Sequence, residues 1–364
     1  MRPNEWFAEA GIEKFVDEVT GVDFASKTAS TASGKKHTYT KLILATGGVP
    51  RSLPLPGFKD GELKNIFMLR TVSDVQGILS AAGESSKEVV VIGSSFIGME
   101  AGNALASKKH KVTIVGMEGA PLERVMGTEV GRIFQKNIEK NGVTFKLNAG
   151  VEKATPSSSN PGSVGAVHLQ DGTVLPADLV ILGVGVRPAT DFLKDNSSIS
   201  LEKDGSIATD ANFAVPGLDG SVFAIGDIAK YPYHGPGGNG TPVRIEHWNV
   251  AQNAGRAAAR AIVHARHAPL SSLTPKPFIP IFWSALGAQL RYCGNTINGY
   301  DDMILHGQPE EGKFVAYYCR DDVVLALASM GMDPIMAKAA DLMRRGKMPS
   351  KKEVASGVDI LQIK

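Results

Sequence analysis

Two apolar runs, separated by a glycine-containing turn and a helix-forming segment, constrain the fold of this chain most. Residues 88–92 read EVVVI and residues 111–115 read KVTIV. Continuous β-branched runs of this kind are typical of strands buried on both faces of a parallel sheet. The segment between them, GSSFIGMEAGNALASKKH, has a helical composition. Residues 88–115 therefore predict one strand–helix–strand unit of an α/β fold.

The turn of this unit has the composition of a dinucleotide-binding loop. Gly93 permits a tight turn, and Gly98 lets the helix pack closely on the sheet. The free N–H groups at the start of the helix would attract a pyrophosphate. Ser95 stands where the motif has its middle glycine, so an ordinary strand–helix turn without a nucleotide is the alternative. The residues expected to bind a nucleotide here are Gly93, Ser94, Ser95, Phe96, Ile97 and Gly98.

The end of the next strand bears on the choice between NADH and NADPH. An NAD site usually has an acidic residue there for the ribose 2′-hydroxyl. Here Gly116 follows the strand and Glu118 comes two residues later, so we expect no clear acid to repel a 2′-phosphate. Arg124 or Lys111 would attract that phosphate unless both are solvated surface charges. The choice stays open, and any preference for NADH should be below about tenfold, or about 1.4 kcal/mol.

Similar runs extend the α/β pattern along the chain. We expect a separate C-terminal α+β module, in which residues 314–319 and 322–328 are paired strands. Residues 166–170 and 179–182 should be strands flanking a turn at Asp171-Gly172. The remaining expected strands are 41–45, 143–147 and 222–225, and the expected helices are 71–82, 128–141, 249–268 and 334–345.

Composition narrows the classes of protein. The net charge of +2 gives no basis for binding nucleic acid. Cys293 and Cys319 are the only cysteines, which excludes a disulfide scaffold and a CxxC redox centre, and we expect both to be buried packing residues. No apolar run has the length of a membrane span. The first residues have neither a secretory signal nor a transit-peptide pattern, so we expect a cytoplasmic protein, with mitochondria as the alternative.

Four motifs in order carry a family resemblance. ATGGVPR (45–51), the unit at 88–115, GVGVRP (183–188) and VFAIGD (222–227) together resemble the flavin-dependent pyridine-nucleotide disulfide oxidoreductases. EHWNVAQNAGRAAA, PIFWS, LRYCG, FVAYY and the tail LASMGMDPIMAKAADLMRRGK resemble its ferredoxin-reductase-type and apoptosis-inducing-factor-like branch, whose members often carry an N-terminal Rieske domain. The resemblance extends over essentially the whole chain.

The resemblance implies the cofactors FAD and NAD(P)H and assigns residues to each. Glu100 would orient the nicotinamide ring, although a carboxylate near a helix start also favours the helix dipole. Trp248 and Trp283 would line the isoalloxazine pocket, and His247 would bond the flavin edge; otherwise these three are packing residues. The FAD side would include Ala45, Thr46, Gly47, Arg51, Gly226, Asp227, His247, Trp248 and Trp283. The NAD(P)H side would add Gly183 and Gly185 to residues 93–98.

The implied function is NAD(P)H-dependent, FAD-linked electron transfer to an iron–sulfur protein, a quinone or another acceptor. Since the chain lacks a CxxxxC pair, electrons would leave the flavin without thiol chemistry. A homodimer is a further expectation. The implied architecture is two Rossmann-like dinucleotide-binding domains and a C-terminal α+β domain, at residues 1–73 with 200–270 (FAD), 74–199 (NAD(P)H) and 275–364.

One part of the family pattern is missing. No strand–GxGxxG–helix motif precedes Lys41, so we expect the FAD domain to be incomplete at its N-terminal side and to hold FAD weakly. Two alternatives stay open: a non-catalytic, nucleotide-binding interaction protein like the cell-death effectors, and a truncated inactive fragment.

Overall fold

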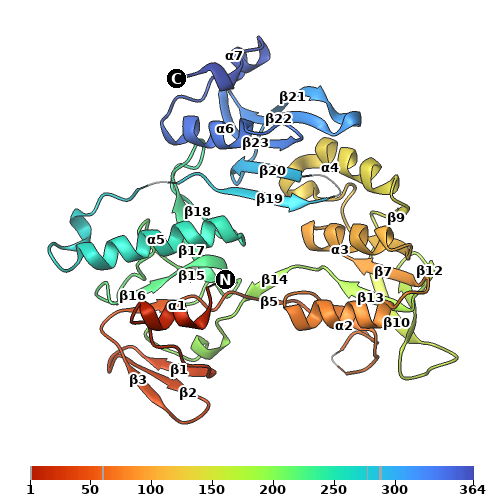
Figure 1. Cartoon of the computed structure of the whole chain (residues 1–364), viewed down its shortest axis with the longest axis horizontal. Helices are drawn as coiled ribbons and strands as arrows, with labels where there is room; N and C mark the ends of the chain where they lie inside the picture. The colour runs from red at the N-terminus through yellow and green to blue at the C-terminus, as the bar shows by residue number, and fades with distance from the viewer. Residues whose placement is uncertain (1, 60, 277, 287–288) are drawn as a thin grey trace.

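The computed structural model describes residues 2–59, 61–276, 278–286 and 289–364 and has a mixed α/β architecture (Figure 1). Its helices and strands form three sets. These are a five-stranded parallel sheet with its helices, a second α/β unit built around a two-stranded parallel sheet, and a five-stranded antiparallel sheet near the C-terminus. The predicted fold class is confirmed. Among the described residues, no helix has the length and apolarity needed to cross a membrane.

The parallel sheet is the frame of the first set. Its strands, in spatial order, are β6 (Ile66–Met68), β13 (Leu179–Leu182), β7 (Glu88–Ile92), β8 (Lys111–Val115) and β9 (Val143–Lys146). All four neighbouring pairs are parallel. β6 lies ahead of the domain boundary expected at residue 74, yet it is the edge strand of this sheet.

Both faces of this sheet are covered, which explains its uninterrupted apolar strands. Val89 and Val91 pack with the helices α2 (Val72–Ala82), α3 (Phe96–Ser107) and α4 (Glu123–Glu139). Val90 and Ile92 point to the opposite face, as successive strand residues must. There they pack against an antiparallel sheet of β10 (Val151–Pro156), β11 (Val164–Leu169) and β12 (Val174–Pro176).

The strands expected at 166–170 and 179–182 are both present, but they belong to different sheets: β11 pairs with β12 around the Asp171-Gly172 turn, and β13 enters the parallel sheet. The helix expected at 128–141 is present as the second part of α4, and a short helical segment from Glu123 precedes it. Gly127 interrupts this helix with φ 73° and ψ 165°, a conformation open to glycine. This break explains why the sequence pattern indicated a helix start at residue 128.

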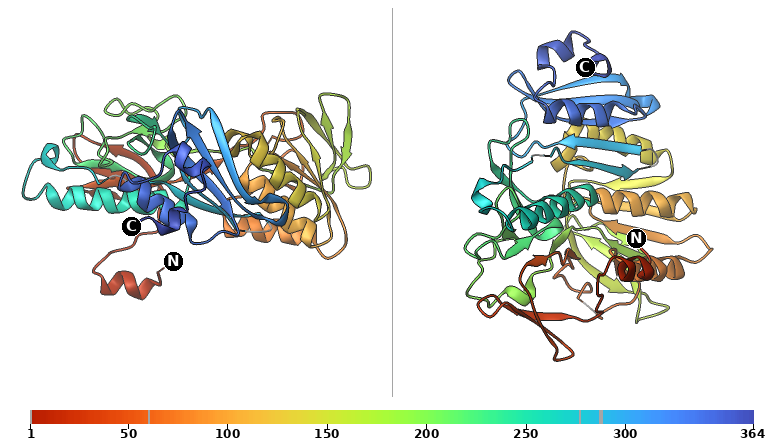
Figure 2. Two further views of the ribbon diagram at one scale, coloured as in Figure 1. Left: turned by 90° about the horizontal axis from the view of Figure 1, so that it is seen from above. Right: turned by 60° about the vertical axis from the view of Figure 1, so that its left-hand side comes forward.

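The second unit surrounds β4 (Leu42–Leu44) and β16 (Val222–Ala224), which pair in parallel. The helix α5 (Trp248–His264) buries an alanine-rich face against it. Around them lie the antiparallel sheet β1 (Val19–Asp23), β2 (Thr28–Thr31) and β3 (Lys36–Thr38), and the sheet β15 (Ile207–Ala208), β17 (Ala229–Tyr233) and β18 (Thr241–Val243). The helix α1 (Asn4–Glu9) buries none of its residues and stands off the body (Figure 2).

Two chain segments cross between the two α/β units. β5 (Gly48–Pro50) and β14 (Val186–Pro188) pair antiparallel there. Thr46 Oγ1 donates to the Ala189 carbonyl at 2.7 Å, and Arg51 Nε donates to the Val186 carbonyl at 3.1 Å. In the structure these two predicted FAD-side side chains therefore fasten the crossing.

The C-terminal sheet contains the paired strands expected from sequence. Its order is β19 (Ile281–Ala285), β20 (Gln289–Gly294), β23 (Val323–Met330), β22 (Lys313–Arg320) and β21 (Asp302–Gln308). The helices α6 (Ile335–Arg344) and α7 (Lys351–Ala355) follow, and the pairing of β22 with β23 confirms the predicted hairpin. Cys293 and Cys319 are fully buried, as expected.

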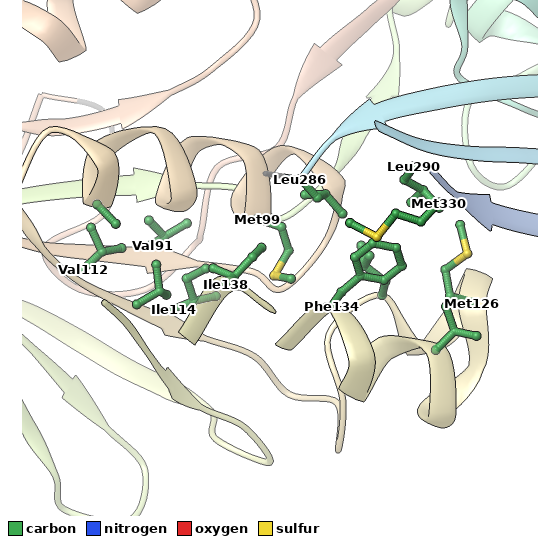
Figure 3. Close-up of a cluster of buried hydrophobic side chains, with 14 of the residues drawn as sticks. Val91, Met99, Val112, Ile114, Met126, Phe134, Ile138, Leu286, Leu290 and Met330 are labelled. Atoms are coloured by element: carbon green, nitrogen blue, oxygen red, sulfur yellow. The ribbon is translucent and has the colours of Figure 1, made fainter. Parts of the chain in front are cut away.

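This sheet shares a hydrophobic core with the parallel sheet. Phe134 and Met126 of α4 lie against Leu290 and Met330 of the C-terminal strands (Figure 3). The buried Tyr318 hydroxyl also donates to the Met126 carbonyl at 2.8 Å. The C-terminal domain is thus packed on α4 through side chains that exclude water.

Candidate functional site

A cavity of about 450 Å³ opens at the carboxyl ends of β7, β8 and β13. In parallel α/β sheets this edge is where ligands bind. Its wall is formed by the β7–α3 turn, by the start of α4 and by the segment after β13. The lining residues are Leu53, Leu55, Ile92, Gly93, Ser94, Ser95, Phe96, Val115, Met117, Glu118, Leu122, Glu123, Arg124, Val125, Ala149, Gly150, Val151, Gln170, Gly183, Val184 and Gly185.

Three glycines shape the turn at the base of this cavity. A Cβ added at Gly98 would collide with the Gly93 carbonyl oxygen, and one added at Gly93 would collide with the Gly183 carbonyl oxygen. A Cβ at Gly183 would lie 3.0 Å from Gly98 Cα. Since Gly93 also has φ +109°, a larger residue there would be strained in any case. These positions bring the start of α3 against the ends of β7 and β13.

The start of α3 is open to an anion. Ser95 is the N-cap residue, but its hydroxyl donates to the Gly183 carbonyl at 2.9 Å. The Ser95 side chain therefore does not cap the first N–H groups of this helix. These donors and the positive end of the helix dipole fit a pyrophosphate. Of the predicted loop residues, Gly93 to Phe96 line the cavity, whereas Ile97 and Gly98 do not.

The acidic side of the cavity differs from the sequence expectation. Glu118 lines it, accepts a hydrogen bond from Ser94 Oγ at 3.3 Å and pairs with Arg124 Nε at 3.0 Å. The expectation that no clear acid lies here is therefore wrong. Lys111 lies at the opposite end of the sheet, where it is exposed and pairs with Glu88 at 2.8 Å, in agreement with the alternative of a solvated surface charge. The loop after β8 turns Glu118 back to the strand end, which residue spacing alone does not show.

A second group of predicted residues lies at the carboxyl ends of β4 and β16. Gly47 and Gly226 both have positive φ, +73° and +69°. Asp227 pairs with Arg70 Nη2 at 2.7 Å. A Cβ on Gly47 would come within 3.3 Å of the same Arg70 nitrogen. The structure thus brings the ATG and GD motifs together around one guanidinium group.

Arg70 is a site residue that sequence reasoning missed. It directly precedes the N-cap of α2, where Thr71 and Asp74 form a capping box. Asp74 Oδ2 accepts hydrogen bonds from the backbone N–H groups of Arg70 and Thr71, at 2.9 and 2.7 Å. The sequence signal that could have indicated Arg70 is a basic residue between a strand and a well-capped helix. The sequence does not indicate its partner, because Asp227 is 157 residues away.

An exposed aromatic group lies beside these motifs. Trp248 is 60% and Trp283 46% exposed, so neither is a core residue. Their ring centroids are 5.7 Å apart, and His247 lies 5.1 Å from the Trp283 ring. Burial lowers the pKa of His247, against the opposing influence of the Trp283 backbone and of the Asp227 and Glu100 carboxylates. These rings offer a partly exposed stacking surface with a neutral imidazole beside it.

Glu100 does not line the 450 Å³ cavity. From the second turn of α3 its carboxylate accepts hydrogen bonds from Ser284 Oγ and from the Ala285 backbone N–H, the latter at 3.0 Å. Both donors belong to β19, next to Trp283. Glu100 therefore joins the nucleotide-binding unit to the C-terminal domain, and its role toward nicotinamide stays a prediction.

The comparisons with known proteins agree with this geometry. A family model for pyridine nucleotide-disulphide oxidoreductases matches residues 7–255, and one for the reductase C-terminal domain matches residues 281–362. The chain belongs to the pyridine nucleotide-disulphide oxidoreductase family. Proteins of this family use FAD and NAD(P)H, the two cofactors predicted from the sequence, so the predicted family resemblance is confirmed.

Curated relatives place the chain on the predicted branch. It is 37% identical over 358 residues to apoptosis-inducing factor 3 of Mus musculus, which covers 97% of this chain and 55% of that protein. The chain thus spans about half the length of this relative. It is 32% identical to the 5,5′-dehydrodivanillate O-demethylase ferredoxin reductase subunit of a Sphingobium species, covering 90% of this chain and 75% of that protein.

Solved structures of this family share the architecture. The covalent putidaredoxin reductase–putidaredoxin complex superimposes with a TM-score of 0.85 and 26% identity, covering 97% of this chain and 81% of that chain. The ferredoxin reductase for the CYP199A2 system from Rhodopseudomonas palustris gives 0.86 and 25%, covering 99% of this chain and 84% of that chain.

Proposed function

We propose that this chain is an NAD(P)H-dependent, FAD-linked oxidoreductase that passes electrons to an iron–sulfur protein, a quinone or another acceptor. The observation that carries the proposal is the cavity at the open start of α3, closed behind by Gly93, Gly98 and Gly183. It offers the N–H donors, dipole and backbone approach that a nicotinamide dinucleotide needs.

The residues on the second side fit one part of FAD. Gly47 and Gly226 leave backbone without side chains at adjacent strand ends, where a ligand can approach closely. The Asp227 carboxylate can accept hydrogen bonds from ribityl hydroxyls, and the Arg70 guanidinium can pair with a pyrophosphate. Bound FAD would supply a hydride acceptor that can also release single electrons.

The chain's own residues bind and orient. The loop 93–96 holds the dinucleotide, and Arg70 with Asp227 fixes the flavin side relative to α2. Glu100 fastens β19, and with it Trp283, to α3. His247, kept neutral by its lowered pKa, adds no positive charge beside the aromatic surface. In this proposal no residue acts as a nucleophile.

The acceptor side requires no thiol of this chain. Burial raises the pKa of Cys293 to about 12 and that of Cys319 to about 11, so neither forms a thiolate at neutral pH. An iron–sulfur acceptor is supported by the relative named as a ferredoxin reductase subunit and by the similar structure solved with putidaredoxin.

The test is spectroscopic. Purified protein supplied with FAD should show flavin absorbance, and anaerobic NADH or NADPH should bleach it. Re-oxidation is then followed with a [2Fe–2S] ferredoxin, a soluble quinone and ferricyanide in separate mixtures. Gly98→Leu should lose the bleaching and Gly255→Ala should keep it. If the protein binds flavin but neither NADH nor NADPH reduces it, the proposal is contradicted.

A second candidate is a non-catalytic, nucleotide-binding interaction protein. The relative named apoptosis-inducing factor 3 favours it. In that case NAD(P)H would bind and change the association state without reducing flavin, which the same experiment reveals when combined with sedimentation. Sedimentation also tests the expected homodimer. The cytoplasmic location is proposed on the sequence alone, and imaging of a tagged protein against a mitochondrial marker tests it.

A further inference from the structure

We infer that Tyr318 of the C-terminal domain is a positioning residue for nicotinamide nucleotide binding, because its hydroxyl fixes the turn of α4 that forms one wall of the cavity. This inference rests on the proposed function and adds to it a residue that does not line the cavity. Tyr318 lies in β22, is fully buried and donates to the Met126 carbonyl at 2.8 Å. Burial raises the pKa of this hydroxyl well above its usual value of about 10, so it remains a donor at neutral pH.

The turn that Tyr318 holds, residues 122–126, is shared between the cavity wall and α4. Residues 122–125 line the cavity. The Leu122 N–H donates to the Ser94 carbonyl of the nucleotide-binding loop at 3.0 Å, and the Met126 N–H donates to the Leu122 carbonyl at 2.9 Å. A displacement of Met126 would therefore move the wall and, through Leu122, the loop.

This turn needs an anchor outside its own helix, since α4 is interrupted directly after it. Gly127 has φ 73° and ψ 165°, which ends the regular helical geometry. The last carbonyls before such a break lack regular helical partners, and a buried one needs another donor. The Tyr318 hydroxyl supplies that donor from a strand 192 residues further along the chain.

A second tyrosine of the C-terminal domain closes the break. A Cβ on Gly127 would collide with the Tyr300 hydroxyl oxygen, so this hydroxyl occupies the space of a side chain at position 127. The rings of Tyr300 and Tyr318 lie edge to face, with centroids 5.1 Å apart. Within α4 itself, the Thr128 hydroxyl donates to the Glu123 carboxylate at 3.1 Å across the break. The break is thus held from the C-terminal domain as well as from within the helix.

Apolar packing alone would not set the position of the turn. Met126 and Met330 belong to the cluster between α4 and the C-terminal strands (Figure 3). Methionine side chains are flexible and adapt to small shifts of the surfaces that they join. A hydrogen bond to a backbone carbonyl instead specifies the distance and direction of one main-chain atom. The Tyr318 hydroxyl therefore determines where the wall lies.

The experiment is calorimetric binding of NAD⁺ and of NADP⁺ to wild type and to Tyr318→Phe, which requires no flavin and no turnover. The substitution keeps the ring and removes only the donor. The variant should bind the nucleotide that wild type prefers at least about fivefold more weakly, the lower end of typical couplings between separate sites. Thermal unfolding of each protein measures the stability cost separately.

The matched control is Tyr317→Phe, on the opposite face of the same strand. Its side chain is 3% exposed and packs with residues of α6, away from α4. Tyr317→Phe should retain wild-type affinity, even where its thermal stability falls as far as that of Tyr318→Phe. Wild-type affinity in folded Tyr318→Phe, or an equal loss of affinity in Tyr317→Phe, would overturn the inference alone.

A second variant keeps the test decisive if Tyr318→Phe does not fold. Tyr300 is 39% exposed, so Tyr300→Phe is a milder change at the same break, and it should also weaken nucleotide binding. If only this variant folds, an unchanged affinity overturns the inference. Folded wild type that binds neither nucleotide would overturn the proposed function and this inference with it.

Discussion

Gly98 has a hydrogen atom where other residues carry a side chain, and both the fold and the site require this. Its Cα lies against the end of β13, and a Cβ there would meet the Gly93 carbonyl. Backbone atoms cannot move aside as a flexible side-chain end can, so any larger residue must lift α3 off the sheet. The N–H groups that would bind a pyrophosphate would move with it.

We predict that Gly98→Ala lowers the free energy of unfolding by about 1–3 kcal/mol, as overpacked sites do. It should also weaken NAD⁺ binding. Urea unfolding and calorimetry measure the two effects. The matched control is Gly255→Ala in α5, where an added Cβ meets only Ile225 Cδ1 at 3.7 Å. This control should gain about 0.5–1 kcal/mol from helix propensity. If Gly98→Ala changes neither the free energy of unfolding nor NAD⁺ binding, the turn can relax to accommodate the added methyl group.

His247 gives a prediction about pH. Burial lowers its pKa below the usual value of about 6.5, so the unfolded chain binds this proton more readily than the folded one. Its contribution to stability is therefore complete above about pH 6.5 and declines as the pH falls below that value. His247→Asn, which retains an N-cap acceptor for α5, should flatten the decline between about pH 7 and about pH 5.5. Urea unfolding at both pH values measures this, and an unaltered slope would contradict it.

At the scale of elements, α3 and β19 are joined by Glu100. The carboxylate receives two donors from a strand 184 residues further along the chain. The same strand carries Trp283, so the position of the aromatic surface depends on this junction. A docking role and a role in orienting nicotinamide make different demands on the side chain, since docking needs an acceptor oxygen and orientation by charge needs a carboxylate.

We predict that Glu100→Ala costs about 1–3 kcal/mol of stability because it leaves the Ser284 hydroxyl and Ala285 N–H without their acceptor. Glu100→Gln keeps an acceptor oxygen and should cost less. Thermal unfolding compares the variants. If docking is the main role, Glu100→Gln also retains flavin reduction by NADH in a stopped-flow experiment. A stable Glu100→Gln with slow reduction would instead support the predicted charge-based role.

Elements whose signals are local could be predicted from the sequence. β7, α3 and β8 agree with their patterns because burial on both faces fixes β-branched strands and the glycines fix the turn. The short helical segment before Gly127 and the partner of β13 could not be predicted, since a helix break and a choice between two sheets depend on tertiary packing. Glu118 and Arg70 were missed for the same reason: one needs the path of a loop, the other a distant partner.

At the scale of the whole molecule, the two cysteines lie in strands of the C-terminal sheet, with both side chains closed to solvent. Cys293 pairs in register with Ile281 and Leu327, and Cys319 lies in β22. Electron transfer through them would require thiols that burial keeps protonated. The route out of the protein should therefore be independent of sulfur.

We predict that replacing both Cys293 and Cys319 by alanine, which adds no buried hydroxyl, leaves NADH-dependent ferricyanide reduction within about tenfold of wild type, or about 1.4 kcal/mol of barrier. Flavin-loaded protein is assayed beside a single Cys293→Ala control, with circular dichroism to confirm folding. A larger loss of ferricyanide reduction in folded protein would indicate that the cysteines of the C-terminal domain take part in electron transfer.

The side chains shared by α4 and the C-terminal strands have a consequence for how the molecule comes apart. Because Phe134, Met126, Leu290 and Met330 belong to one buried cluster, opening either domain exposes apolar surface of the other. We therefore expect the parallel-sheet domain and the C-terminal domain to unfold as one cooperative unit. Damage to the C-terminal strands would appear as faster amide exchange in α4, at the wall of the nucleotide cavity.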